Sequence, residues 1–357
     1  MSFIRGKRIG LVTLFLMLSA CGRTTPVAPE SLVVTEASVE ISITETSTSE
    51  SPTPTPATFT NPVLDQDFPD PDVLKVGDIY YAYATNANGV NIQAARSADL
   101  VHWEVLGETL PELPAWAAPE STSVWAPEVF SPAEGQFIMY FVARFAIGFG
   151  GTQCIGLATS DDPAGPFISS NPEPFICQTD QGGSIDPSMI LDSDGQRYVL
   201  WKNDGNSSGY QVWLYIQKVS ADGLMLQGEP QRLLTVDQIW EGIVVEAPTL
   251  WRQDDKYYLF YSANAYNDQR YATGYAVAED ILGPYVKADE PLLATNLAAG
   301  LVGPGGQDII AGPHGGTWII FHGWAPGAYR RLYLAPLHWQ NGVPTLGLKD
   351  REPLPMP

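Results

Sequence analysis

The chain has 357 residues and a formal net charge of −21 at pH 7, because 40 acidic residues stand against 19 lysines and arginines. Such a charge repels nucleic acids and other polyanions, so a role that follows a phosphate backbone is excluded and a neutral ligand is favoured. Net charge says nothing about the fold, which the pattern of residues along the chain must supply.

The first residues have the pattern of a secretory signal. Three basic residues precede an apolar run over residues 9–18, and small residues follow. The run is shorter than the roughly 20 apolar residues of a membrane-spanning helix, and this order of regions is typical of a signal peptide. "LSAC" resembles a bacterial lipobox, in which the cysteine becomes the lipidated first residue. We therefore expect a lipoprotein signal over 1–20 and a lipid on Cys21 that anchors an exported protein to a bacterial membrane, facing the periplasm or the cell exterior. The alternative is an ordinary signal peptide with a nearby cysteine.

Residues 21–60 are predicted to be a disordered tether. The stretch "TETSTSESPTPTPATFT" consists mainly of Ser, Thr, Pro and Glu. Such a composition cannot bury enough apolar surface to offset the entropy of ordering, and proline keeps the chain extended. We expect the tether to hold a globular domain, residues 61–357, away from the membrane surface.

One pattern occurs five times in this domain. An aromatic and aliphatic segment begins about every 60 residues, just after a polar turn, at Tyr80, Phe137, Tyr198, Tyr257 and Trp318. These are strand and hairpin signals, without helical periodicity between them. A sandwich would not keep such even spacing, and a solenoid would have shorter repeats. We predict one all-β domain, a five-bladed β-propeller.

The segment before each turn carries a proline at a fixed place. It stands at positions 71, 127, 187 and 248, and a glutamine stands in the fifth equivalent place. In a propeller the first strand of each blade lines the central channel, and proline suits the opening of that strand, where no ladder donor is needed. Acidic residues lie before and after these positions: Asp70, Asp186, Glu246, Asp72, Glu128 and Asp308. Acids distant in sequence therefore converge on one channel, although an aspartate before a proline is also a common turn residue.

Converging carboxylates have a specific chemical use. In a desolvated pocket they push each other's pKa values apart, so one keeps its proton while another is ionised. Hydrolysis of a glycosidic bond needs both forms, a protonated acid at the leaving oxygen and an ionised partner that activates water or attacks C1. The acids of this channel are therefore candidates for the cleavage of a sugar linkage.

The domain resembles glycoside hydrolase family 43, whose five-bladed propellers cleave α-L-arabinofuranosyl and β-xylosyl linkages with inversion. "FPDPDVL" looks like the first-blade motif of the family, which implies that Asp70 is the general base. "SIDPSMIL" resembles the third-blade motif, which implies that Asp186 orients the acid and raises its pKa. "VEAPTLW" resembles the fourth-blade motif, which implies that Glu246 is the general acid. The alternatives are turn-forming aspartates and a glutamate that pairs with an arginine.

The same resemblance implies residues that contact the substrate. "SVWAPEVF" is similar to the family's "WAPDV" segment and places Trp125 and Glu128 near the sugar, with Glu128 as support. Trp240, in "IWEG", is a second candidate for stacking on a sugar face. For the other tryptophans, packing between blades is the expectation. "YRRLYLAP" resembles the closing segment, in which an arginine hydrogen-bonds the sugar. This implies Arg330, with Arg331 as its rival.

The resemblance also raises the question of a metal ion. Many arabinan-cleaving members carry a central ion, often calcium, approached by a histidine of the last blade, and "IIFHGW" places His322 on the inner face of the fifth hairpin. The family's frequent "GPGH" is here "GPGG", with Gly306 where that histidine would fall. Because calcium prefers oxygen ligands, we expect either a Ca²⁺ ion that His322 contacts through water or a buried histidine with a structural role.

Two cysteines, Cys154 and Cys177, follow Cys21. In an exported protein one disulfide between them is expected. Two unpaired buried thiols are the alternative.

The leading hypothesis is an inverting, exo-acting α-L-arabinofuranosidase that acts on arabinan or arabinoxylan side chains as a monomer. β-Xylosidase and endo-1,5-α-L-arabinanase share the three acids and stay open as alternatives. A non-catalytic propeller that binds surface glycans, or a protein-binding scaffold, belongs to a different class. Neither would need to keep a general acid.

Overall fold

A computed structural model describes residues 57–119, 123–146, 151–326, 329–348 and 352–357. They belong to one compact unit, Pro54–Pro357. The predicted signal, Cys21 and nearly all of the predicted tether lie outside the described residues. Within the part of the chain that is described, no helix is long and apolar enough to cross a membrane.

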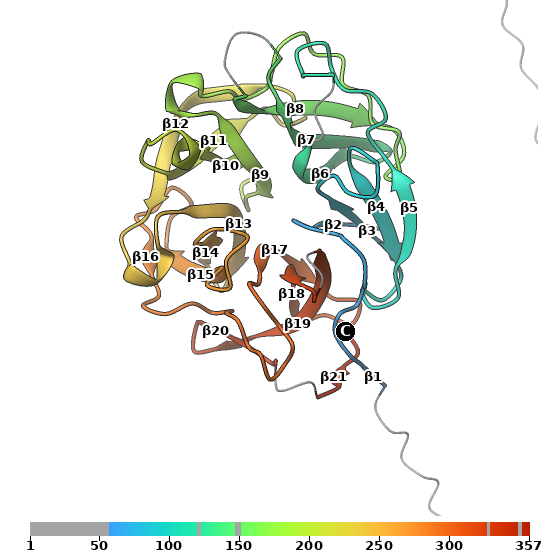
Figure 1. Cartoon of the computed structure of the whole chain (residues 1–357), viewed down its shortest axis with the longest axis vertical. Helices are drawn as coiled ribbons and strands as arrows, with labels where there is room; N and C mark the ends of the chain where they lie inside the picture. The colour runs from blue at the N-terminus through green and yellow to red at the C-terminus, as the bar shows by residue number, and fades with distance from the viewer. Residues whose placement is uncertain (1–56, 120–122, 147–150, 327–328, 349–351) are drawn as a thin grey trace, which may run out of the picture. The chain divides into compact units, whose positions relative to one another are not determined.

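Five sheets surround a central channel as the blades of a propeller (Figure 1). The first contains β2 (Asp72–Val76), β3 (Ile79–Ala84), β4 (Gln93–Ser97) and β5 (Glu104–Glu108). The second contains β6 (Trp125–Ala133), β7 (Gln136–Arg144) and β8 (Gln153–Ser160). The third contains β9 (Ser184–Leu191), β10 (Arg197–Asn203), β11 (Trp213–Val219) and β12 (Leu226–Thr235). The fourth contains β13 (Val245–Gln253), β14 (Lys256–Ala263), β15 (Ala272–Ala278) and β16 (Val286–Lys287). The fifth contains β17 (Gly305–Ala311), β18 (Thr317–Trp324), β19 (Arg330–Gln340) and β20 (Val343–Leu346).

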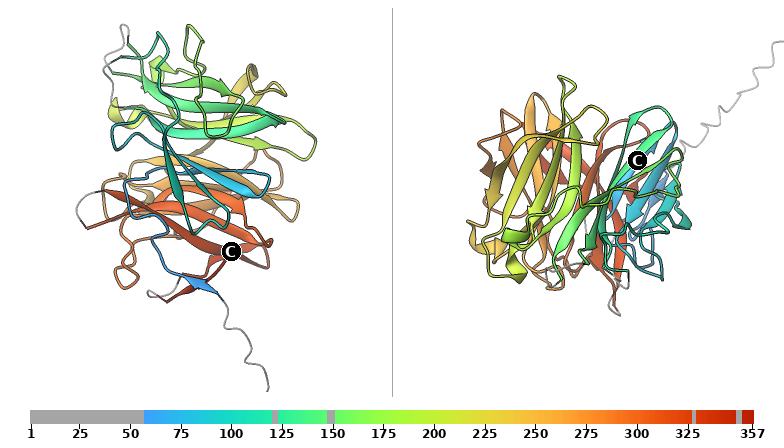
Figure 2. Two further views of the ribbon diagram at one scale, coloured as in Figure 1. Left: turned by 90° about the vertical axis from the view of Figure 1, so that its right-hand side faces the viewer. Right: turned by 90° about the horizontal axis from the view of Figure 1, so that it is seen from above.

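The first strand of each blade is the innermost, as predicted. Each of these strands contacts the next one around the ring, from β2 through β6, β9, β13 and β17 and back to β2. From the side, the blades appear as layers packed face to face (Figure 2). The prediction of an all-β, five-bladed propeller is therefore confirmed. Short 3-10 helices η1 (Thr179–Gln181), η2 (Gly205–Ser207) and η3 (Ile239–Glu241) lie in the loops.

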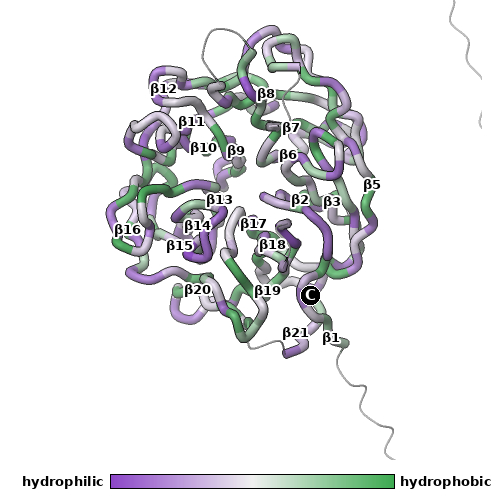
Figure 3. Tube along the Cα trace, in the orientation of Figure 1, coloured by the Kyte–Doolittle hydropathy of each residue, from purple (hydrophilic) through white to green (hydrophobic). Residues whose placement is uncertain are grey.

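The apolar core is divided among the spaces between blades. One cluster of buried residues lies between each pair of neighbouring blades, and the aromatic second strands supply much of it; Tyr198 of β10 and Tyr257 of β14 share one such cluster. Burying one such side chain stabilises the fold by about 1.5–3 kcal/mol. The aromatic segments that recur in the sequence are therefore the segments that form the contacts between neighbouring blades. Hydrophilic residues appear instead where β2 reaches the channel (Figure 3).

The chain ahead of the first blade closes the ring on the fifth. Phe68 N–H donates a hydrogen bond to the carbonyl of Arg330 at 2.8 Å. The side chain of Asn61 exchanges two hydrogen bonds with the backbone of Leu334. This closure places the segment that carries Asp70 beside the strand that begins with Arg330.

A two-stranded sheet joins the ends of the described unit. β1 (Thr58–Phe59) pairs antiparallel with β21 (Leu354–Pro355). These two residues of β1 come from the end of the segment 21–60 that composition assigns to the tether. Phe59 is buried, and its ring lies 6.3 Å from that of Trp318. Phe59 thus packs the end of this polar segment onto the fifth blade, and the average composition of the segment does not reveal this contact.

Cys154 of β8 and Cys177, in the loop before η1, form a disulfide with Cα atoms 4.8 Å apart. Of the two alternatives left open by the sequence, the structure has the bridge. It ties the outermost strand of the second blade to the chain that leads into the third.

Candidate active site

One residue of each blade has a left-handed backbone conformation at the channel. The values of φ are 51° at Asp70, 36° at Ala126, 55° at Asp186, 48° at Ala247 and 55° at Gly306. Residues other than glycine rarely adopt this conformation, and in the second to fifth blades it coincides with a β-bulge between the first two strands. A bulge re-aims the side chain it carries. The carboxylates of Asp70, which has the same backbone conformation without a bulge, and of Asp186 both face one end of the channel.

A cavity of about 340 Å³ opens at this end, within the size range of small-molecule pockets. The three predicted acids line it together: Asp70, Asp186 and Glu246. Trp125 and Arg330, two of the predicted sugar contacts, line it as well. Its wall is completed by residues that include Thr85, Lys202, Asp204, Asn206, Tyr266 and Tyr271.

The environment of Asp70 favours its ionised form. Arg330 Nη1 lies 3.0 Å from Asp70 Oδ1 and 3.3 Å from Oδ2, and the hydroxyl of Thr85 donates to Oδ2 at 2.6 Å. Burial raises the pKa of Asp70, but the charge of Arg330 and these hydrogen bonds outweigh burial and bring the pKa below its ordinary value. Asp70 is therefore a carboxylate at neutral pH.

His322 contacts Asp70 as a neutral ring. Asp70 N–H donates to His322 Nδ1 at 3.1 Å, while burial and the charge of Arg330 lower the pKa of His322 to about 3. Nδ1 is thus the acceptor, and the ring hydrogen is on Nε2, which is buried without a partner among the described atoms. Gly306 makes this contact possible, because a Cβ there would lie 2.7 Å from the ring and 2.8 Å from Asp70 Oδ1. The glycine that departs from the family pattern leaves the space that His322 and Asp70 share.

These residues do not fit a calcium ion bound directly to His322. Its Nε2 presents a hydrogen rather than a lone pair, and calcium takes oxygen ligands. In the described ranges no group of three or more His, Cys, Asp or Glu side chains is arranged to hold a metal ion. A calcium ion held through water stays a prediction.

Asp186 and Glu246 form a pair of acids on the other side of the cavity. Asp186 Oδ2 accepts a hydrogen bond from the N–H of Ala247 at 2.9 Å, directly beside Glu246. The oxygens of Glu246 accept hydrogen bonds from Tyr271 OH at 2.9 Å and from Lys202 Nζ at 3.1 Å. Burial, followed by the negative charge of Glu246, raises the pKa of Asp186 to about 7. Below that pH the pair keeps a proton, in the same cavity as the ionised Asp70.

Arg330, rather than its rival Arg331, belongs to the cavity. Its guanidinium lies 5.2 Å from the ring centroid of Tyr266 and 5.9 Å from that of Trp324. Arg331 pairs instead with Asp65, at 2.7 Å. The two neighbours on β19 therefore point to different partners, as alternating side chains of a strand do.

Trp240 and Glu128 do not line the cavity. Trp240 belongs to η3, and its indole stacks on Tyr261 with ring centroids 6.0 Å apart, so it packs against β14. Glu128 lies deeper in the channel. The structure thus does not bring these two predicted sugar contacts to the acids with which they were grouped.

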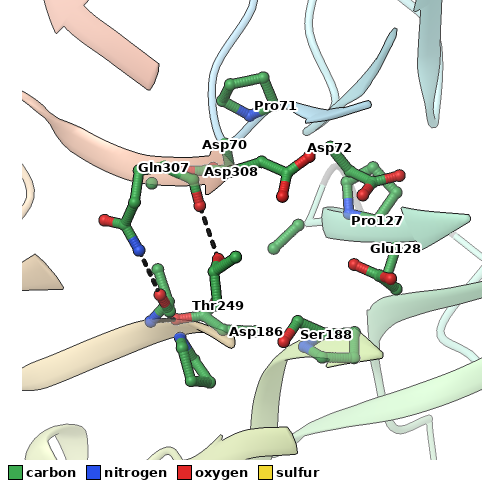
Figure 4. Close-up of a pocket in the computed structure, with 15 residues that line it drawn as sticks. Asp70, Pro71, Asp72, Pro127, Glu128, Asp186, Ser188, Thr249, Gln307 and Asp308 are labelled. Carbon is green, nitrogen blue, oxygen red and sulfur yellow. Dashed lines mark hydrogen bonds between the residues drawn. The ribbon is translucent and has the colours of Figure 1, made fainter. Parts of the chain in front are cut away.

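Asp72, Glu128 and Asp308 form a second group of acids in the channel (Figure 4). Asp72 follows Asp70 by two residues, which is about 6.7 Å along a strand. Together with Asp70 and Asp186 they line a space of about 40 Å³, enough for water and too small for a sugar. They also line a cavity of about 380 Å³ to which Asp70, Asp186 and Glu246 do not contribute. We call Asp70, Asp186 and Glu246 the upper layer and these three acids the lower layer.

The lower layer has no cation. Among the described residues, no lysine or arginine pairs with any of its acids. Burial, and then the charge of Asp308, raises the pKa of Asp72; burial, and then the charge of Asp72, raises that of Glu128. Burial raises the pKa of Asp308 to about 7. These acids therefore favour their protonated forms.

Thr85, Lys202 and Ser262 occupy the position of His322 in other blades, and the sequence motifs did not identify them. Each is a buried polar residue at the end of the second strand of its blade, and Ser262 pairs directly with Glu246 on the inner strand. A polar residue that closes an otherwise apolar, aromatic segment was visible in the sequence. That recurring position is the signal that finds them.

Comparisons with known proteins identify the family of the chain. The model of the family "Glycosyl hydrolases family 43" matches residues 59–344. The chain is 26% identical over 320 residues to an extracellular exo-alpha-(1->5)-L-arabinofuranosidase of Cellvibrio japonicus, covering 80% of this chain and 87% of that protein. It is 24% identical over 298 residues to a putative beta-xylosidase of Xylanibacter ruminicola, covering 82% of this chain and 50% of that protein. The crystal structure of a thermostable family-43 glycoside hydrolase matches with 32% identity and a TM-score of 0.75, covering 84% of this chain and 99% of that one. The chain thus spans about half the length of several curated relatives.

Proposed function

The chain belongs to glycosyl hydrolase family 43, and we propose that it is an inverting, exo-acting α-L-arabinofuranosidase. One observation carries the proposal. A carboxylate held ionised, Asp70, and a pair of acids that keeps a proton, Asp186 with Glu246, face the same cavity. These are the two protonation states that glycoside hydrolysis needs at once.

Glu246 acts as the general acid. It gives its proton to the glycosidic oxygen as the bond from that oxygen to C1 breaks. Asp186 holds the backbone next to Glu246 through the N–H of Ala247. Asp186 therefore acts through Glu246 as a positioning residue.

Asp70 acts as the general base. It takes a proton from the water that attacks C1 on the face opposite the leaving oxygen, so the configuration at C1 inverts. Arg330 and Thr85 keep Asp70 ionised for this task. Arg330 and Trp125 also face the sugar, one as a hydrogen-bond donor and the other as a flat apolar wall.

The substrate we propose is a terminal arabinofuranosyl unit of arabinan or of an arabinoxylan side chain. The net charge of −21 favours a neutral glycan. The Cellvibrio japonicus relative is named an exo-arabinofuranosidase, and the matched region covers 87% of it. By contrast, only half of the putative beta-xylosidase is covered.

We further propose that the protein is an exported lipoprotein, anchored through Cys21 and active as a monomer outside the cytoplasm. Two relatives are named extracellular, which supports export. Labelling of the mature protein with a radioactive fatty acid tests the anchor, and loss of label in Cys21→Ala is the expected result. Elemental analysis of the purified protein tests for bound calcium.

The products of hydrolysis test the proposed function. The purified protein and Glu246→Gln are incubated with arabinan, arabinoxylan and xylo-oligosaccharides, and the sugars released are separated by chromatography. Arabinose released by the parent and not by the variant is expected. Xylose alone would instead make the protein a β-xylosidase, and oligosaccharides alone would make it an endo-arabinanase. Sugar that binds and is never cleaved would contradict an enzyme and favour a glycan-binding propeller.

A further inference from the structure

Lys202 is a buried cation that faces the proposed general acid. Its side chain is only 1% exposed, and Nζ lies 3.1 Å from Glu246 Oε2 and 3.7 Å from Asp204 Oδ1. Burial lowers the pKa of Lys202, but the negative charges of Glu246, Asp186 and Asp204 outweigh burial and keep the amine protonated. A buried ammonium is costly unless it is paired. The buried charge of Lys202 is therefore tolerated because acids at the cavity pair with it.

The fold does not require a charge at this position. Lys202 lies opposite Ile185 of the inner strand, and the corresponding residues are Val142 in the second blade and the neutral His322 in the fifth. Since valine and a neutral histidine occupy this position in other blades, packing of the blade does not explain why it is a lysine here. The acids at the cavity explain it, because they pair with its charge.

The charges around Lys202 are unbalanced when every acid is ionised. The titratable and charged groups that face Glu246 and Lys202 come from several elements: Asp186 of β9, Asp204 after β10, Tyr271 before β15 and, across the cavity, Asp70 with Arg330. On the side of Lys202, three acids share one ammonium. The position of the proton on the Asp186–Glu246 pair therefore determines which ionised carboxylate pairs with the ammonium of Lys202.

Building on the proposed function, we propose that Lys202 is a positioning residue that serves as a movable counter-ion for Glu246. While Glu246 carries its proton, the ammonium pairs with Asp204. As the proton passes to the glycosidic oxygen and the C1–O bond breaks, the ammonium stabilises the carboxylate that forms on Glu246. The attacking water loses its proton to Asp70, and Lys202 neither gains nor loses one.

The contacts of Glu246 suit this exchange. Tyr271 OH binds Oε1 at 2.9 Å and can hold the side chain in place, while Lys202 binds the other oxygen, Oε2. The second partner, Asp204, is within 4 Å of the same ammonium, so a small movement is enough. A fixed positive charge near the point where negative charge develops stabilises the transition state.

The test compares two leaving groups on the full-length protein. Lys202→Met removes the charge at similar volume, Lys202→Arg keeps the charge, and Lys218→Met is the matched control, an exposed lysine of β11 that does not line the cavity. The substrates are the methyl and 4-nitrophenyl glycosides of the pentose that the parent releases. Methoxide leaves only when it is protonated, whereas nitrophenolate leaves with little help from an acid.

We expect Lys202→Met to lower kcat/KM about 10- to 100-fold for the methyl glycoside and less than about 5-fold for the nitrophenyl glycoside. The basic limb of the pH profile moves to higher pH, because the positive charge that favours ionisation of the Asp186–Glu246 pair is gone. Lys202→Arg regains most of the activity, and Lys218→Met behaves as the parent. Equal losses on both substrates with an unmoved basic limb would overturn the proposal, since a merely structural role affects both alike.

Asp204→Asn supplies a shift of opposite sign and serves if Lys202→Met does not fold. Without its second partner, Lys202 stays on Glu246 and the pair loses its proton at lower pH. The basic limb then moves to lower pH, and the methyl glycoside is again the more affected substrate. A basic limb that moves to higher pH or stays at the parent's pH would contradict the proposal that Lys202 exchanges between Asp204 and Glu246.

Glu246→Gln, measured beside these variants, separates the inference from the proposed function. It should lose far more activity on the methyl glycoside than on the nitrophenyl glycoside. Equal losses in Glu246→Gln would mean that Glu246 is not the acid, and both proposals would fail. If Glu246→Gln loses more activity on the methyl glycoside and Lys202→Met loses activity equally on both glycosides, the proposed function stands and only the inference about Lys202 is overturned.

Discussion

The upper and lower layers of the channel contain three acids each, all on or next to the inner strands of the blades, and differ in their cations. In the upper layer, Arg330 binds Asp70 and Lys202 binds Glu246. No such pair is formed in the lower layer within the described ranges of the chain. Burial without a cation favours the protonated form of a carboxyl group. The cations are what allow one part of the channel to hold ionised and protonated acids together.

The layers also border different cavities. The upper layer opens into a cavity of about 340 Å³ that Lys202 and Arg330 line with it, whereas the lower layer borders a cavity of about 380 Å³ in which no cation of the described residues pairs with its acids. Hydrolysis of a glycosidic bond needs an ionised and a protonated acid together. We therefore assign the chemistry to the upper layer, and we expect the lower layer to contribute to the stability of the fold and its dependence on pH.

The largest expected difference lies between matched glutamates of the two layers. Glu246→Gln should lower kcat on a poor leaving group roughly 10²- to 10⁴-fold, the usual range for loss of a general acid. Glu128→Gln should stay within about 3-fold of the parent, because the amide replaces a protonated carboxyl that does not line the cavity of the upper layer. Steady-state kinetics on the methyl glycoside measure both. A loss in Glu128→Gln as large as in Glu246→Gln would break the comparison.

Removing the cation of Asp70 should change the pH profile. In Arg330→Met the pKa of Asp70 rises, because burial is no longer opposed by the positive charge. The base must be ionised, so the acidic limb of kcat/KM moves to higher pH by about 1–3 units. Arg331→Met, which removes the neighbouring arginine from its pair with Asp65, is the control and should keep the parent's limb. An acidic limb that is the same in both variants would show that Arg330 does not hold Asp70 ionised.

The lower layer should limit stability at high pH. Folding raises the pKa of Asp72 above its ordinary value of 3.8, so its favourable contribution is complete below that pH and is lost as the pH rises through the higher, folded-state value. Asp72→Asn imitates the protonated form. Its amide can accept from Val129 N–H and donate to Glu128, with which Asp72 shares a side-chain hydrogen bond. We expect a melting temperature equal to that of the parent near pH 4 and higher by about 2–4 °C at pH 8. Calorimetry at both pH values decides, and a variant less stable than the parent at pH 8 would mean that Asp72 is ionised in the folded protein.

The smallest difference concerns two hydroxyl groups. The hydroxyl of Thr85 donates to Asp70 and accepts from Ala126 N–H, so Thr85→Ala should lower kcat/KM about 3- to 10-fold. Ser188 lines the space of about 40 Å³ beside the lower layer, and its buried hydroxyl has no partner among the described atoms. Ser188→Ala should leave kcat/KM unchanged within about 2-fold. Equal effects would mean that the layers are not distinct in function.

The sequence was sufficient for the ring of blades and for the acids that face it. Evenly spaced prolines and aromatic segments identified the inner strands and the contacts between blades. Along a strand, residues two apart share a face, so Asp70 and Asp72 were both expected at the channel. Their different depth was not predictable, because it depends on where the cavity ends.

Other residues needed the fold. Trp240 precedes Glu246 closely in the sequence, but η3 turns its ring onto Tyr261. Tyr271 reaches Glu246 from the loop before β15, a neighbourhood that only the pairing of β14 with β15 creates. Lys202 is opposite Ile185 only once the bulge shifts the pairing of β9 with β10.

The stereochemistry of the first product tests the central claim most directly. Proton NMR follows the anomeric signals while the parent hydrolyses the 4-nitrophenyl glycoside of its pentose, faster than the free sugar mutarotates. The account predicts that the first sugar to appear has the configuration opposite to that of the substrate, because Asp70 activates water rather than attacking C1 itself. A first product of retained configuration would contradict it and make Asp70 a nucleophile.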